Sequence, residues 1–364
     1  MYWAQRRWKS PQWLWLKHPP FDGEKAYEFD SLQSLLSGRL PLVEKLCYTT
    51  SPMSSADGRE GATVNMFWHG ERLPPLVWAC MRSFVENGHH LRVFSYGAPA
   101  LPDGVERADA REISEAGPGA DHRAIAAFSD LFRYRLLYQC GGWWVDTDVY
   151  CVARELPLVS YAWAEQEPGI INGAILKFPA RDPLCGEMLQ RAIERSRRPV
   201  EWGAIGPDLL TAMLAQRREP VPWGTMDSFY PWNWREAALA WFPETKAAAV
   251  LRMKNAAFVH LWFYSLRQMG IDLARDPPTG SLWADLIRDC PNRLPSDERY
   301  RQDVARGVRR FLRNHCRGPE RRRLMTLYPE LFRAAGARST LAEFLALGSE
   351  RLRAGLGLQD AGRS

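Results

Sequence analysis

Between residues 62 and 96 the chain alternates short apolar runs with one amphipathic stretch. Val64–Trp68 and His90–Tyr96 have the length and apolar character of strands, and Val77–Glu86 between them has a helical pattern. A strand, helix, strand order of this kind is typical of an α/β layered sheet. Ligands of such sheets gather at the carboxyl ends of the parallel strands, so the residues that follow each strand are candidates for a site.

A longer helix is predicted next, over His122–Gln139, because its apolar residues recur at the spacing of one buried stripe. Two glycines follow it, as is common past a helix end. The apolar run Trp143–Val145 then predicts a strand that leads directly into Asp146 and Asp148. Both carboxylates are therefore expected at the carboxyl end of a strand of the sheet.

The second half of the chain continues the mixture of strands and helices. Strand-like residues occur within Pro157–Phe178 and at Phe258–Trp262, and helices are predicted over Leu184–Arg195 and Asp208–Gln216. Beyond Leu266 the chain is rich in Arg and mostly helical. We therefore expect an α/β body that is followed by a helical region.

Three segments are predicted from changes in this pattern. Residues 1–60 are interpreted as an N-terminal extension, because prolines interrupt them and they end in the small, polar, linker-like stretch Ser51–Gly61. Residues 61–275 are predicted to form the α/β domain, and residues 276–364 a basic, mostly helical C-terminal extension.

The composition is that of a globular protein. Of 364 residues, 46% are hydrophobic, which is enough to bury a large core. The seven cysteines include no CxxC pair and are odd in number, so they predict neither a zinc knuckle nor a complete disulfide framework. No stretch has the pattern of an export signal or the length of a membrane span. We therefore expect reduced thiols and a cytoplasmic location.

Net charge is only +6, but it is concentrated in residues 293–323, which contain eleven Arg and four acidic residues. A solvated helix face is the simplest explanation of this stretch. An anionic membrane surface is another, which the Trp- and Arg-rich residues 1–20 could share. Nucleic acid is not expected as a partner, because no nucleic-acid module accompanies the basic stretch. We expect either peripheral contact with the inner face of the membrane or packing of both segments on the α/β domain.

Asp146 and Asp148 are the strongest chemical signal in the chain. Two carboxylates one residue apart, at the end of an apolar strand, repel each other and lose hydration unless a positive group joins them. A divalent cation meets this requirement, since carboxylate oxygens suit Mn²⁺ or Mg²⁺ and such an ion keeps positions for substrate phosphate oxygens. A surface turn with two solvated aspartates is the alternative, because D-x-D is a short and common pattern.

Asp130 and Arg133 lie three residues apart on the predicted helix before this strand, and therefore on one helix face. Their face differs from that of the predicted buried stripe. As an exposed pair they would contribute well under ~1 kcal/mol. Alternatively, both reach toward the end of the strand and bind hydroxyl groups of a sugar.

Residues 129–148 contain more than the two aspartates. They include Ser129-Asp130-Leu131-Phe132-Arg133-Tyr134, Leu137-Tyr138, Gly141-Gly142, Trp144 and Asp146-Thr147-Asp148. This set resembles the sugar-binding region of a DXD glycosyltransferase family, which includes fungal initiating mannosyltransferases, animal α-1,4-galactosyltransferases and bacterial capsule or lipopolysaccharide enzymes. A weaker similarity extends over residues 64–262. The resemblance implies a GT-A fold, a Rossmann-like sheet with helices on both faces that binds a nucleotide sugar, with Asp146 and Asp148 as catalytic residues and metal ligands.

The resemblance also implies roles for residues outside this region. Trp68 matches the aromatic residue that stacks on uracil, and a core Trp is the alternative. Asn172 and Gly173 match a segment that lines the sugar site, and a simple turn is the alternative. Asp208 lies in Gly206–Thr211, which resembles the family's GP-x-LT element and could equally start a helix.

Three further residues complete the predicted site. Thr147 lies between the two aspartates and is expected at the substrate. His260 and Trp262 match an H-x-W near the end of the catalytic domain, where enzymes of this fold often complete the metal site. A neutral imidazole is an acceptable ligand for Mn²⁺, so His260 is predicted as the third metal ligand and Trp262 as a substrate contact. A histidine satisfied within the core is the alternative.

Together these expectations describe a metal-dependent glycosyltransferase that moves a sugar from a nucleoside-diphosphate donor to a glycan or lipid-linked saccharide. The Trp68 match favours a UDP-sugar. The resemblance implies retention of configuration, whereas inversion would need a base, with Glu165, Glu167 and Asp208 as candidates. The alternatives are a toxin-like enzyme that glycosylates protein and a non-catalytic nucleotide-sugar-binding protein, which the presence of all four charged residues disfavours.

Overall fold

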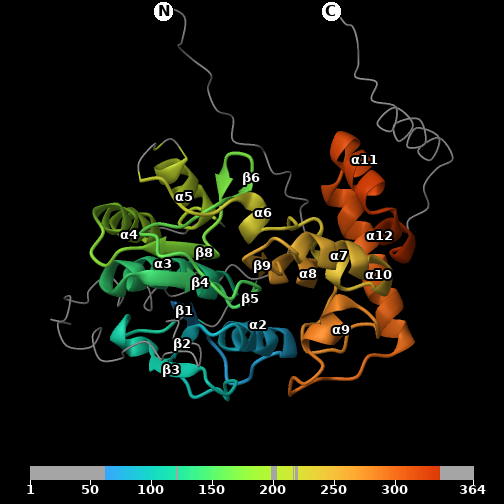
Figure 1. Cartoon of the computed structure of the whole chain (residues 1–364), viewed down its shortest axis with the longest axis horizontal. Coiled ribbons are helices and arrows are strands. Elements are labelled where there is room, and N and C mark those ends of the chain that lie inside the picture. Colours follow the sequence, from blue (N-terminus) through green and yellow to red (C-terminus); the bar gives the residue numbers. More distant parts are fainter. Residues whose placement is uncertain (1–61, 120–121, 198–202, 216, 218–219, 337–364) are drawn as a thin grey trace, which may run out of the picture.

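The computed structural model describes residues 62–119, 122–197, 203–215, 217 and 220–336 (Figure 1). The predicted N-terminal extension, with its Trp- and Arg-rich first twenty residues, and the last part of the C-terminal extension lie outside the described residues.

A five-stranded sheet forms the centre of the molecule, in the order β3-β2-β1-β4-β8. The first four strands in this order run parallel, and β8 runs antiparallel to β4. The prediction of an α/β sheet is confirmed, and the arrangement is consistent with a GT-A-like fold. The strands are β1 (Thr63–Phe67), β2 (His90–Ser95), β3 (Glu106–Asp109), β4 (Gly142–Val145) and β8 (Ile175–Phe178).

Helices and two small sheets complete the described fold. A two-stranded sheet pairs β5 (Val149–Cys151) with β9 (Phe258–His260), and another pairs β6 (Glu165–Glu167) with β7 (Ile170–Ile171). Short 3₁₀ turns occur at Ala110–Glu112, Ala237–Ala240 and Pro243–Thr245. The helices are α2 (Pro75–Glu86), α3 (His122–Cys140), α4 (Pro183–Ser196), α5 (Pro207–Leu214), α6 (Met226–Phe229), α7 (Lys246–Met253), α8 (Phe263–Gln268), α9 (Leu282–Leu286), α10 (Glu298–His315), α11 (Gly318–Leu327) and α12 (Pro329–Ala334).

Alternate side chains of the central strands enter two separate cores, because successive residues of a strand point to opposite faces of the sheet. Met66 and Trp143 lie in the core that contains α2 and the C-terminal helices. Phe67 and Trp144 lie in the core that contains α3, α4 and α5. Helices therefore cover both faces of the sheet, as predicted.

Two glycines make the sharp connection from α3 to β4. Gly141 and Gly142 have φ angles of +66° and +86°, which side chains disfavour. A Cβ on Gly141 would also lie 2.4 Å from the backbone nitrogen of Ala180. The connection holds β4 in the sheet so that Asp146 follows at its carboxyl end.

The described part of the C-terminal extension packs on the α/β body. Val304, Val308, Phe311 and Leu312 of α10 are buried in the same core as residues of β1 and β4. The apolar stripe of this basic helix is therefore covered by protein, which supports the packing alternative for α10. None of the helices in the described residues is long and apolar enough to cross a membrane. The six cysteines among the described residues are all free thiols.

Candidate functional site

A buried arginine connects α3 to the carboxyl end of β4. Arg133 donates one hydrogen bond to Asp130 Oδ1 and another to Asp146 Oδ1, each over 2.7 Å. Its side chain is only 5% exposed, so the solvated-pair alternative is excluded. The helix face that carries these residues is not an exposed face, because it lies against the end of the strand.

The two carboxylate oxygens of Asp146 differ in their hydrogen bonds. The indole N–H of Trp144 donates to Oδ1 over 2.8 Å, and Oδ1 also accepts the bond from Arg133. The Arg133 guanidinium lies over the Trp144 ring, 5.2 Å from its centre. No described residue donates a hydrogen bond to Oδ2, and the side chain is 27% exposed. Oδ2 is thus held in a fixed position where a ligand can reach it.

Burial and charge act together on this cluster. Burial raises the pKa of Asp130 to about 6, and the nearby Asp146 carboxylate adds to the rise while Arg133 opposes it. Burial alone would lower the pKa of Arg133, but Asp146 and Asp130 raise it instead, so the guanidinium stays charged. The Arg133 guanidinium therefore pairs with two carboxylates at once. Because one positive charge cannot neutralise two negative charges, the carboxylates can still accept hydrogen bonds from a ligand.

Two glycines from distant segments contact this charged cluster. A Cβ on Gly173 would lie 2.4 Å from Arg133 Nη1, and a Cβ on Gly206 would lie 2.7 Å from Asp130 Oδ2. The segments that contain these glycines are thus brought against the residues predicted to bind the sugar. Any side chain at either position would push into the cluster.

Asn172 and Asp208 have different surroundings. The Asn172 side chain is buried, accepts the Ala174 N–H over 2.6 Å and donates to Gln166. Its amide therefore holds the turn that brings Gly173 to the site. Asp208 is exposed in the first turn of α5, and its carboxylate does not bond to the charged cluster in the described part of the chain.

The pairing of β5 with β9 brings Asp148 and His260 together. Val149 lies opposite His260 in this antiparallel pair, and His260 Nε2 is 3.1 Å from Asp148 Oδ2. The backbone N–H of Phe263 donates to the same oxygen over 3.0 Å. Burial would raise the pKa of Asp148, but His260 and these hydrogen bonds lower it, so the carboxylate stays ionised.

Trp262 follows in a strained conformation. Its φ and ψ are 59° and 52°, in the left-handed region, which costs a side-chain-bearing residue roughly 1–3 kcal/mol. Its indole N–H donates to the Trp232 carbonyl over 3.0 Å, and its ring lies 4.0 Å from that of His260. The strained residue therefore fixes the histidine, and at 7% exposure it offers little surface to a substrate.

The predicted metal site can be compared with the side chains that would bind the ion. Among the described residues, no three His, Cys, Asp or Glu side chains are grouped so that they could hold a metal ion. Asp148 and His260 lie close enough to share one, whereas Asp146 Oδ1 is bonded to Arg133 and only its Oδ2 is left for a ligand. Mg²⁺ and similar ions commonly take one or two protein ligands plus water and substrate phosphates. The residues present fit such a partial ligand set, not a closed three-ligand site.

Tyr230 belongs to this site although its sequence context predicts no role for it. Its ring centre lies 6.0 Å from that of His260 and 5.8 Å from that of Trp262. Its buried hydroxyl has no hydrogen-bond partner of normal geometry in the described structure. Burial raises the pKa of Tyr230, and the charge on Asp146 raises it further. In the sequence, Tyr230 is distinguished only by its place in the aromatic-rich residues 223–242. That feature is too general to identify a single site residue.

Two of the remaining predicted residues, Trp68 and Thr147, are partly exposed. Trp68 directly follows β1 at its carboxyl end, is partly exposed, and donates its indole N–H to the Gly70 carbonyl over 3.0 Å. Thr147 lies in the half-buried turn between the two aspartates. Among the candidate bases, Glu165 is exposed and accepts the Gly169 N–H.

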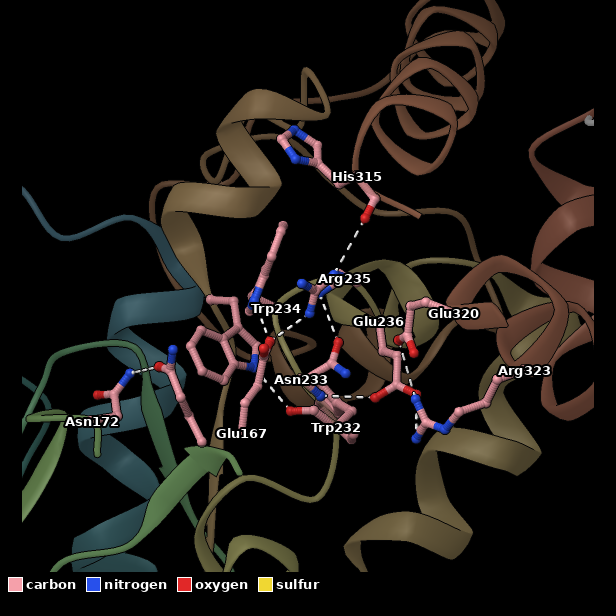
Figure 2. A network of polar contacts seen from close by, with 12 residues as sticks. Glu167, Asn172, Trp232, Asn233, Trp234, Arg235, Glu236, His315, Glu320 and Arg323 are labelled. Carbon is pink, nitrogen blue, oxygen red and sulfur yellow. Dashed lines mark hydrogen bonds and ion pairs between the residues drawn. The ribbon is translucent and has the colours of Figure 1, made fainter. Parts of the chain in front are cut away.

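Glu167 is held by a network that reaches the C-terminal helices (Figure 2). Its Oε1 accepts hydrogen bonds from the Trp234 indole over 2.6 Å and from Arg235 over 2.5 Å. Arg235 also donates to the His315 carbonyl at the end of α10, and Trp234 packs edge-on against Phe311. The network secures the β6–β7 hairpin, which leads into the turn at Gly173.

Comparisons with known proteins leave the family of this chain open. No known protein family matches it, and no curated protein matches it. Among solved structures, one named PaToxG glycosyltransferase aligns with a TM-score of 0.35 and 13% identity, over 69% of this chain and 85% of that one. A likeness at this level carries no argument about activity, which must be inferred from the site.

Proposed function

We propose that this chain is a metal-dependent glycosyltransferase that moves a sugar from a nucleoside-diphosphate donor to a glycan or lipid-linked saccharide. The observation that carries the proposal is the buried chain Asp130–Arg133–Asp146 at the carboxyl end of β4. Buried ion pairs of this kind are weak stabilisers, so stability alone gives little reason to build one at a strand end. Ligands of parallel sheets bind at that edge, where these polar groups are fixed in place.

The sugar of the donor would lie against this cluster. Asp146 Oδ2 can accept a hydroxyl hydrogen bond, and Gly173 and Gly206 keep side chains out of the space beside Arg133 and Asp130. Trp68 offers a partly exposed ring at the end of β1, which supports a stacked uracil and hence a UDP-sugar.

Asp148 and His260 are the residues that would hold Mn²⁺ or Mg²⁺. When bound, the ion supplies positive charge that stabilises the departing diphosphate. The chain itself keeps Asp148 ionised through His260 and the Phe263 N–H. Asp146 remains anchored by Arg133 and Trp144, so the two carboxylates have separate tasks.

Retention of configuration agrees with the surroundings of the three candidate bases. The Glu167 carboxylate is bonded to Arg235 and Trp234, and Glu165 and Asp208 are exposed. None of the three lies bonded to the charged cluster in the described structure. A mechanism in which the departing phosphate takes the acceptor proton needs no such base.

A donor screen tests the proposal. Purified protein with Mn²⁺ is incubated with UDP- and GDP-sugars, and slow hydrolysis is followed for wild type, Asp148→Asn and a surface control, Asp103→Asn. We expect hydrolysis of at least one donor, lowered about 10²-fold or more in Asp148→Asn and unchanged in the control. Equal hydrolysis in all three proteins would refute the site, and donor binding without hydrolysis would favour a nucleotide-sugar-binding protein.

A further inference from the structure

A cavity lies in the C-terminal part of the described chain. Its volume is about 310 Å³, at the lower end of the ~300–1,000 Å³ typical of small-molecule sites. Its walls come from the loop before α9, from α9 itself, and from the segment that leads into α10. None of the residues that line it belongs to the Asp146 site.

The walls of the cavity are tied together by the fold. The backbone N–H of Asp276 donates to the Leu294 carbonyl, and the Leu294 N–H donates to the Ala274 carbonyl, each over 2.8 Å. The Ser296 hydroxyl donates to the Asp276 carbonyl. The loop and the approach to α10 are thus fixed against each other, so the cavity is formed without a ligand.

The carboxylates of the walls already have cationic partners. Asp276 pairs with Arg293 over 2.6 Å. Asp285 pairs with Lys246 over 2.5 Å and with Arg288 over 3.0 Å. The acidic groups of the cavity are therefore neutralised by neighbours and do not balance any further positive charge.

Arg301 is the exception among the charged residues of the cavity. It makes no side-chain hydrogen bond or ion pair with any described residue, and its Nε–H is buried without an acceptor. An unpaired buried donor is costly, and a charged one more so. The geometry of a guanidinium suits an oxyanion, because its N–H groups form a fork that can bind two oxygens at once.

The loop before α9 offers further donors. Thr279 and Gly280 line the cavity, and neither backbone N–H donates to another group within the described residues. Backbone amides that donate to no protein group can bind phosphate oxygens together with a guanidinium. The cavity thus presents donors and surplus positive charge, with no uncompensated acid.

We propose that this cavity binds the phosphate group of a small molecule, with Arg301 as its main charged contact. The ligand is either inorganic phosphate or a phosphate carried by a sugar. The proposal does not depend on the glycosyltransferase activity, because the two sites share no residue.

Calorimetric titration of the full chain tests this proposal. The probes are inorganic phosphate and glucose 6-phosphate, in low-salt buffer with a chelator so that no metal contributes. We expect saturable binding to wild type that is weakened about tenfold or more in Arg301→Gln. Arg299→Gln, which changes an exposed arginine on the same helix, should bind as wild type does.

Two additional variants make the result decisive. Arg301→Lys keeps the charge and should recover part of the affinity, and Asp148→Asn should bind both probes as wild type does. Tighter binding of glucose 6-phosphate than of phosphate would assign the site to a phosphorylated sugar, and equal binding would assign it to phosphate itself. Absence of saturable binding, or equal affinity in wild type and Arg301→Gln, would overturn the proposal.

Discussion

Gly173→Ala tests the contact between the hairpin turn and the charged cluster. The added Cβ would lie 2.4 Å from Arg133 Nη1, 3.0 Å from Leu210 Cδ1 and 3.2 Å from Arg133 Cζ. Because carbon contacts are favourable near ~3.5 Å, the guanidinium must move by about 1 Å. Arg133 cannot move freely, since it is buried and bonded to Asp130 and Asp146.

The magnitude follows from these contacts. Overpacking of a tight interior costs about 1–3 kcal/mol of unfolding free energy, which for a protein of this size lowers Tm by about 2 °C per kcal/mol. A displacement of about 1 Å in a substrate-positioning group can lower activity about 10²-fold. Urea unfolding and donor hydrolysis would measure the two effects separately.

Gly97→Ala is the matched control. Gly97 has no positive φ, and a Cβ there would meet nothing within 4 Å, so this variant should equal or slightly exceed wild type in stability. If Gly173→Ala unfolded at the same urea concentration as Gly97→Ala, the close contact would be wrong. If it were destabilised yet hydrolysed its donor at the wild-type rate, Arg133 would have no part in sugar binding.

Two further predictions concern stability alone. Arg235→Gln should lower the unfolding free energy by about 1–3 kcal/mol in urea titrations, because Glu167 loses a charged partner in a largely buried network. The control Arg191→Gln breaks an exposed ion pair and should lower the unfolding free energy by less than ~1 kcal/mol. Equal losses in the two variants would contradict this view. Burial lowers the pKa of His89, whose Nε2–H donates to the Ala153 carbonyl. Because the folded protein resists protonation of this histidine, its unfolding free energy should fall as the pH drops below 6.5, the pKa of His89 in the unfolded chain. His89→Gln should reduce that fall between pH 7.5 and pH 5.5, and an unchanged pH dependence would refute the assignment.

The central strands were predictable because each is a short apolar run. Val64–Trp68 and His90–Tyr96 match β1 and β2 to within one residue at each end, and Trp143–Val145 matches β4. The strand β3 was missed because it consists of Glu106–Asp109, in which only Ala108 is buried. An edge strand exposes most of its side chains, so it lacks the apolar pattern on which the prediction depends.

The residue types of the site were predictable, but their environment was not. Spacing placed Asp130 and Arg133 on one face of a helix, yet only the fold shows that this face is buried against Asp146. The approach of Asp148 to His260 depends on a strand pairing across more than a hundred residues. Tyr230 became visible as a site residue through the same long-range packing, which no local pattern encodes.

Helix α10 shows why amphipathic spacing alone cannot name a partner. Val304 and Phe311 have the periodicity of a helix that lies on a membrane, and the same periodicity serves a helix that packs on a protein core. In the structure both residues are buried inside the protein. A pattern indicates that a surface must be covered, and only the tertiary structure shows what covers it.

The shared core of the α/β body and the C-terminal helices limits how this protein can be divided. Trp283 of α9 meets Trp241 edge-on, and Phe311 of α10 meets Trp234 in the same way, with ring centres 5.8 Å apart in each pair. A chain shortened to end at residue 275 would leave Trp234 and Trp241 without these partners and facing water, and large uncovered apolar patches favour aggregation. The C-terminal helices are therefore inseparable from the α/β body, and protein shortened at this boundary should need detergent or a solubilising fusion to remain in solution.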